Sequence, residues 1–217
     1  MLRLKPDAGP TGELRVLCLG CHPDDIEIGC GGSILRLAAE RQDCVFYWVV
    51  FCAIDIRAAE AKQAIARLVD ASRLKRVVLG SFPDGFMPFV GADIKAVFED
   101  LKQTLSPDLV FTHSRKDAHQ DHRLIAELTW NTFRDHLILE YEVPKYDGDM
   151  GQPSVFVPLS LDVCEKKVAL IMDVFRSQRE KRWFKRETFL ALMRLRGMEC
   201  NAPSGNAEAF YCRKLLL

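Results

Sequence analysis

The sequence carries no net charge, because its 30 basic and 30 acidic side chains cancel at pH 7. Proteins that bind nucleic acid or an anionic membrane surface usually present a basic field, so we expect neither partner. The longest apolar run, residues 44–54, is too short to span a bilayer. Residues 1–10 lack the apolar core of a signal peptide. These absences predict a cytoplasmic protein that works away from membranes.

The cysteines do not indicate a disulfide framework or a redox centre. The eight cysteines are scattered along the chain, and without a secretory signal they are expected to be reduced and buried. Cys18 and Cys21 form a C-x-x-C pair. Cys18, however, lies within a predicted strand, whereas redox pairs usually open a helix.

Short apolar strands alternate with amphipathic helices through most of the chain. Strands are predicted at 14–20, 45–51, 76–80, 109–112 and 137–141, and helices at 33–40, 56–72, 92–105 and 117–133. This alternation predicts an α/β fold with a doubly wound, mostly parallel sheet and helices on both faces. The last third departs from the rhythm, with strands expected at 154–157 and 207–215 and helices at 161–178 and 187–196. The length and the 48% hydrophobic content fit a single domain over residues 1–217.

The first polar motif, His-Pro-Asp-Asp at 22–25, directly follows the first predicted strand. Parallel sheets bind ligands at the carboxyl ends of their strands, and the positive end of a following helix favours ionised carboxylates. We expect a glycine-rich turn at 29–32. Such a turn also suggests a dinucleotide site, but Ile34 stands where the third glycine of G-x-G-x-x-G belongs. Asp24 and Asp25 would also repel a pyrophosphate, so a metal site is the favoured interpretation.

The second polar motif, residues 113–122, follows the fourth predicted strand and should reach the same edge of the sheet. If a helix has begun by His119, then His119 and His122 share one of its faces. Two imidazoles and one carboxylate leave a coordination position open, as in hydrolytic zinc sites and in non-haem iron oxygenases. A spare aspartate can act as the base beside a metal-bound water, which favours hydrolysis. A binding module that merely holds a cation is the non-catalytic alternative.

Together the two motifs resemble those of the N-acetylglucosaminyl deacetylase family, the PIG-L or LmbE-like enzymes. The resemblance extends over most of the chain and includes Arg57, Glu60, Asp84 and residues 207–210. It implies a Rossmann-like fold and a metal-dependent amidohydrolase, usually with Zn²⁺, although Fe²⁺ is an alternative. The implied substrate is a small N-acetylated amino sugar or its conjugate, from which the acetyl group is removed.

Carried over by motif position, the resemblance implies that His22, Asp25 and His122 are the metal ligands. Asp24 would be the general base that deprotonates the metal-bound water before it attacks the amide. After taking that proton, Asp24 could deliver it to the leaving amine. Because three ligands already complete the site, we expect His113 to play a supporting role beside them.

The remaining implied residues serve the transition state and the substrate. His119 would hydrogen-bond the oxyanion of the tetrahedral intermediate, with Asp121 holding its orientation. Arg57 and Asp84 are candidate substrate-binding residues. The sequence does not name the amino sugar, and it leaves the oligomeric state open, a homo-oligomer included.

Overall fold

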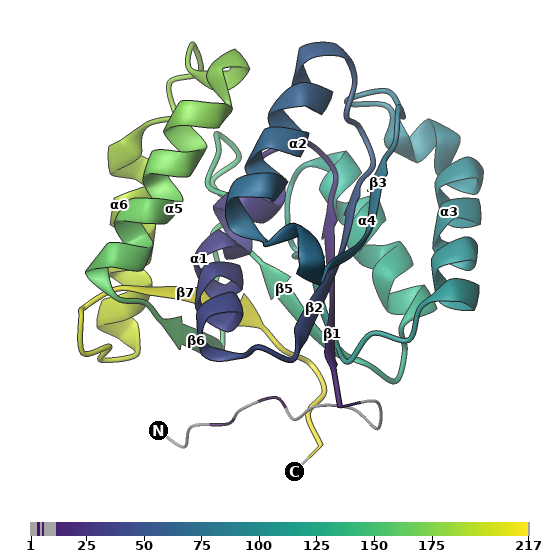
Figure 1. Cartoon of the computed structure of the whole chain (residues 1–217). Coiled ribbons are helices and arrows are strands. Elements are labelled where there is room, and N and C mark those ends of the chain that lie inside the picture. Colours follow the sequence, from purple (N-terminus) through teal and green to yellow (C-terminus); the bar gives the residue numbers. More distant parts are fainter. Residues whose placement is uncertain (1–3, 5, 7–11, 217) are drawn as a thin grey trace.

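Seven strands form one sheet in the order β3-β2-β1-β4-β5-β7-β6 (Figure 1). The computed structural model describes Leu4, Pro6 and residues 12–216, so most of the segment without a signal-peptide core lies outside the described residues. The strands are β1 (Leu14–Gly20), β2 (Cys44–Val50), β3 (Leu74–Leu79), β4 (Leu109–His113), β5 (Leu137–Tyr141), β6 (Val155–Pro158) and β7 (Ala207–Tyr211). The strands from β3 to β5 pair in parallel, whereas β7 runs antiparallel to β5 and β6. The predicted α/β fold with a mostly parallel sheet is confirmed.

Helices cover both faces of this sheet (Figure 1). They are α1 (Asp25–Glu40), α2 (Asp55–Leu68), α3 (Gly91–Thr104), α4 (Gln120–Thr132), α5 (Leu161–Val174) and α6 (Arg186–Glu199), with short 3₁₀ turns η1 (Ala71–Arg73), η2 (Met87–Val90) and η3 (Arg176–Gln178). Helices α1, α2, α5 and α6 pack with one another on one face, and α3 and α4 pack together on the other. None of the helices in the described part of the chain combines the length and apolar character that crossing a membrane requires.

Strand β1 shows how one apolar run serves two cores. Val16 and Cys18 belong to the apolar cluster under α1, α2, α5 and α6, whereas Leu17 and Leu19 belong to the cluster under α3 and α4. Successive side chains of a strand point to opposite faces of the sheet, and here both faces are covered. This is why the strand is apolar throughout instead of alternating with polar residues.

The glycine-rich turn predicted at 29–32 is wrong, because α1 begins at Asp25 and runs through these glycines. A Cβ atom on Gly29 would lie 2.2 Å from a ring carbon of Tyr141, and one on Gly32 would lie 2.5 Å from Leu159 Cδ1. The glycines therefore let α1 pack closely against its neighbours. A consequence is that Asp25 lies in the first turn of a helix and not in a loop.

A buried ion pair fastens α1 to the antiparallel edge of the sheet. The Glu208 carboxylate in β7 accepts N–H groups from Gly32 at 2.7 Å and Ser33 at 2.6 Å. The Lys167 ammonium in α5 donates to Glu208 and to the carbonyl of Ile28, each at 2.6 Å. Burying two charges is favourable only when their remaining polar contacts are satisfied, and these bonds satisfy them. The helix that carries Asp25 is thereby held from two directions.

Candidate metal centre

Both polar motifs lie at the junction of β1 and β4. In the parallel part of the sheet, the chain runs outward from β1 in one direction through β2 and β3, and then returns to β4 on the other side. Such a switch point is where open α/β sheets form their ligand crevice. The structure brings His22, Asp24 and Asp25, which follow β1, together with His119 and His122, which follow β4.

The three residues predicted as metal ligands present one atom each to a common point. His22 Nδ1 lies 3.4 Å from Asp25 Oδ2 and 3.3 Å from His122 Nε2, and the distance from His122 Nε2 to Asp25 Oδ2 is 3.5 Å. In a tetrahedral zinc site, bonds of roughly 2.0–2.1 Å place neighbouring ligand atoms about 3.3 Å apart. The triangle therefore has the dimensions of three of the four ligands of a tetrahedral zinc site.

Each of these imidazoles has a carboxylate beside its other ring nitrogen. His122 Nδ1 lies 2.9 Å from Asp117 Oδ2. His22 Nε2 lies 3.0 Å from Asp84 Oδ1 and 3.4 Å from Asp121 Oδ2. Carboxylates in this position fix the tautomer and the orientation of a metal-binding histidine. Both imidazoles thus turn their second ring nitrogen toward the triangle.

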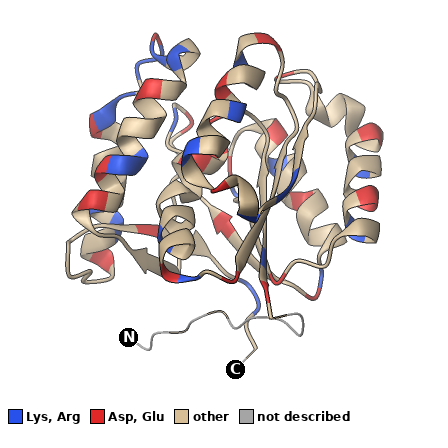
Figure 2. Cartoon of the chain, in the orientation of Figure 1, with Lys and Arg blue, Asp and Glu red and all other residues tan. Residues whose placement is uncertain are grey.

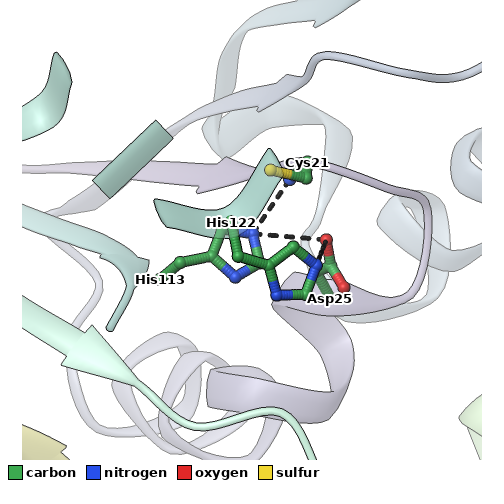
Figure 3. Close-up of side chains that lie close together, drawn as sticks. All are labelled: Cys21, Asp25, His113 and His122. Carbon is green, nitrogen blue, oxygen red and sulfur yellow. Dashed lines mark hydrogen bonds and ion pairs between the residues drawn. The ribbon is translucent and has the colours of Figure 1, made fainter. Parts of the chain in front are cut away.

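A second group of four side chains lies at the buried side of the metal centre. Figure 3 shows Cys21, Asp25, His113 and His122 turned toward one another, and one possible ligand atom of each lies within 4.8 Å of the others. His113 Nε2 accepts the backbone N–H of Cys21 at 3.0 Å, and the His113 ring stacks on His122 with centroids 3.9 Å apart. Burial and the neighbouring His113 lower the pKa of His122 to about 4. His122 is therefore neutral at pH 7, which is the form that binds a metal.

Asp24 has a backbone conformation that is rare for an aspartate. Its φ angle is 106° at the N-cap of α1, in the left-handed region that favours glycine. Arg57 donates to Asp24 Oδ1 at 2.9 Å and also to the carbonyl of Pro23. Burial raises the pKa of Asp24 to about 7, although the Arg57 guanidinium opposes the shift. A carboxylate with a pKa near neutrality can both accept and return a proton.

Asp121, the residue predicted to hold the orientation of His119, contacts it through the main chain. His119 Nδ1 accepts the backbone N–H of Asp121 at 3.3 Å, while the Asp121 carboxylate accepts N–H groups from Gly85 at 2.7 Å and Met87 at 3.2 Å. Burial and the nearby His22 lower the pKa of His119, so its ring is neutral at pH 7. With Nδ1 as the acceptor, the proton of that ring lies on Nε2, which becomes a donor.

The two predicted substrate-binding residues both contact the centre. Arg57 holds Asp24, and Asp84 faces His22. The Asp84 side chain is 58% exposed, so a ligand can still reach it. A sugar contact by Arg57 or Asp84 stays a prediction.

Sequence reasoning gave no role to Asp117 and missed Lys145 altogether. The Lys145 ammonium lies 2.9 Å from Asp117 Oδ1 and 2.8 Å from Asp149, with Asp147 at 3.7 Å. These three carboxylates form an acidic cluster, but Lys145 already lies among them and neutralises part of their charge. Lys145 belongs to a loop with no periodic pattern, and nothing in its spacing links it to the second motif.

Comparisons with known proteins identify relatives of this chain. The family model of PIG-L, described as GlcNAc-PI de-N-acetylase, matches residues 17–133, which contain both motifs. YaiS of Escherichia coli (strain K12), described as an uncharacterized deacetylase, is 28% identical over 143 residues, covering 59% of this chain and 74% of that protein.

Solved structures of two enzymes share the fold. The N,N'-diacetylchitobiose deacetylase of Pyrococcus horikoshii matches with a TM-score of 0.67 and 22% identity, covering 92% of this chain and 84% of that chain. GalB, the 4-carboxy-2-hydroxymuconate hydratase of Pseudomonas putida KT2440, matches with a TM-score of 0.70 and 17% identity, covering 94% and 97%. At these identities the likeness establishes the fold alone, and the fold serves both a deacetylase and a hydratase.

Proposed function

Because the chain belongs to the PIG-L family of de-N-acetylases, we propose that it is a zinc-dependent hydrolase that removes the N-acetyl group from an amino sugar or an amino-sugar conjugate. The observation that carries the proposal is the triangle of His22, Asp25 and His122 with Asp24 directly beside it in the chain. Three ligands and an adjacent carboxylate are the parts that a hydrolytic metal site requires.

The donor set fits zinc. Two imidazoles and one carboxylate, with an open fourth position, are typical of catalytic zinc sites. Bound there by His22, Asp25 and His122, Zn²⁺ would supply a Lewis acid that polarises the acetyl carbonyl and acidifies a water molecule. The same donor set suits Fe²⁺, so the identity of the metal is part of the test.

The side chains around the ligands would carry the protons and the charge. Asp24 takes a proton from the attacking water, and Arg57 keeps that carboxylate in place through Oδ1. His119 donates from Nε2 to the oxygen that becomes negative when water adds to the amide carbon. When the C–N bond breaks, Asp24 returns its proton to the nitrogen of the leaving amine, so that acetate and a free amino sugar result.

Two rival functions have distinct signatures. A non-haem iron oxygenase would use the same ligand triangle, and oxygen uptake with ferrous iron and a cosubstrate would favour it. A non-catalytic module that only holds a cation would bind ligands without hydrolysing any acylated amine. Neither rival requires an aspartate held in a strained conformation beside the ligands, whereas a hydrolase uses that carboxylate.

Metal analysis and acetate release test the proposal together. Purified protein should contain about one zinc per chain and release acetate from an N-acetylhexosamine derivative; a chelator should abolish turnover and added zinc should restore it. Asp24→Asn should keep the metal and lose about 10²–10⁴-fold in kcat, the usual contribution of a general base. Asp93→Asn, on the exposed surface of α3, is the matched control and should remain active. Undiminished turnover in Asp24→Asn would contradict the assignment of the base.

A further inference from the structure

The connection from α5 to α6 is strongly basic. Residues 176–186 carry six cations against the single acidic side chain of Glu180, although the whole chain is neutral. The cations are Arg176, Arg179, Lys181, Arg182, Lys185 and Arg186. Figure 2 shows this blue connection at the upper ends of α5 and α6. We call residues 176–186 the basic segment.

The basic segment is anchored on one side next to the proposed base. The backbone N–H and the hydroxyl of Ser177 donate to the Glu60 carboxylate in α2, at 2.9 and 2.6 Å. Glu60 lies one helical turn after Arg57, which holds Asp24. The first anchor therefore places the start of the basic segment beside the Asp24 side of the centre.

A second anchor lies on the opposite side of the centre. The backbone N–H of Arg182 donates to the hydroxyl of Tyr146 at 3.0 Å. Tyr146 follows Lys145, which contacts Asp117 behind the proposed ligand His122. The two anchors thus connect the basic segment to α2, which carries Arg57, and to the loop that carries Lys145.

Two of the six cations are available to a ligand. Four have partners in the protein: Arg176, Arg179 and Lys185 donate to main-chain carbonyls, and Arg186 pairs with Glu165. Among the described residues, the side chains of Lys181 and Arg182 make no hydrogen bond or ion pair. Both side chains are exposed, and Lys181 lies over the Trp183 ring at 5.7 Å.

We propose that Lys181 and Arg182 bind an anionic group, a phosphate or a carboxylate, carried by the amino sugar whose acetamide reaches the metal centre. This inference rests on the proposed function and names the class of its substrate. An arginine guanidinium can grip two anionic oxygens at once, while a lysine ammonium supplies a point charge, so the pair suits either group. The site itself is rich in carboxylates, and the two cations offset the repulsion that an anionic substrate would meet there.

Matched substrates and a charge-matched control test this inference. We would measure kcat/KM for acetate release by the zinc-loaded enzyme from N-acetylglucosamine, N-acetylglucosamine 1-phosphate and N-acetylmuramic acid, which carries a carboxylate. Wild-type protein should prefer one of the two anionic sugars by about tenfold or more, and the preference should fall as salt rises. Lys181→Ala/Arg182→Ala should bring the ratio close to one. Lys62→Ala/Lys102→Ala removes two exposed charges from α2 and α3 and should keep the preference.

The outcomes separate this inference from the proposed function. Equal rates on neutral and anionic sugars would overturn the anion site and leave the deacetylase intact. A preference that survives in Lys181→Ala/Arg182→Ala would overturn it too, since the anion would then be held elsewhere, for example by the metal. If no sugar releases acetate, the proposed function fails. Calorimetry with N-acetylglucosamine 1-phosphate then decides whether the anion site exists. Binding by wild type that the double variant loses supports the anion site, whereas equal binding or none refutes it.

Discussion

Replacing Asp117 by asparagine tests whether His122 is held in place for a metal. The Asp117 carboxylate accepts the Nδ1–H of His122 through Oδ2 at 2.9 Å, and through Oδ1 it accepts the backbone N–H of His119 at 2.8 Å. Its side chain is only 4% exposed, so water cannot easily take its place. Asparagine has nearly the same shape and keeps an oxygen acceptor, but it removes the negative charge behind the imidazole.

The size of the effect follows from that lost charge. A hydrogen bond to a charged group contributes roughly 1.5–3 kcal/mol and one between neutral groups roughly 0.5–1.5 kcal/mol. The change therefore weakens the support of His122 by roughly 1–1.5 kcal/mol, which corresponds to about five- to tenfold in the dissociation constant of zinc. This lies at or just below the lower end of the 10–100-fold loss that is usual when the partner of a metal-binding histidine is removed. Lys145 keeps Asp149 as a partner, so the variant should still fold.

Competition with a zinc-binding indicator measures the affinity, and urea denaturation of the metal-free protein checks the fold. Asp149→Asn is the control, because Asp149 also contacts Lys145 at 2.8 Å and accepts the backbone N–H of Ala118 at 2.7 Å, but it does not contact His122. The control should leave zinc affinity unchanged. The reasoning is refuted if Asp117→Asn binds zinc within twofold of wild type, or if Asp149→Asn loses as much affinity.

Two further predictions concern stability and use urea denaturation. Gly29→Ala should lower the free energy of unfolding by about 3 kcal/mol, because its Cβ would lie 2.2 Å from the ring of the buried Tyr141. Gly31→Ala has its nearest neighbour at 3.8 Å, so it should be neutral or stabilise α1 by up to about 1 kcal/mol. Equal effects would contradict the packing explanation. Lys167→Met should lower the free energy of unfolding by about 3–5 kcal/mol, because it leaves the Glu208 carboxylate buried without its cation. The double variant Lys167→Met/Glu208→Gln should be more stable than Lys167→Met alone. If the double variant instead loses the sum of what the two single variants lose, the residues act independently.

Sequence patterns located most of the fold because strand and helix signals are local. The strands at 14–20 and 137–141 have the predicted bounds, and the helix predicted at 92–105 is α3 within one residue at each end. The failure at 29–32 has a tertiary cause. Glycine disfavours helices by intrinsic propensity, and only the contact with Tyr141, more than a hundred residues away, makes it the residue that fits there.

The candidate site, too, was predictable from the sequence only in part. Because the carboxyl ends of β1 and β4 adjoin, order and spacing sufficed to predict that His22, Asp25 and His122 would meet. The side chains that orient them depend on contacts between loops. Asp121 illustrates this, since its carboxylate accepts N–H groups of the loop after β3, while its backbone N–H bonds to His119. Motifs name the candidate reacting groups, whereas loop packing decides which side chains support each of them.

Asp24 shows what a motif cannot convey about a residue that it names. A left-handed backbone costs a residue other than glycine about 1–3 kcal/mol, so backbone conformation alone would favour glycine at this position. The structure offsets that cost with the Arg57 bonds to the Asp24 side chain and to the Pro23 carbonyl. Arg57 thereby acts on the conformation of the loop as well as on the charge of the carboxylate. Strained residues cluster at active sites, so the conformation of Asp24 is a physical reason to test it for a catalytic role.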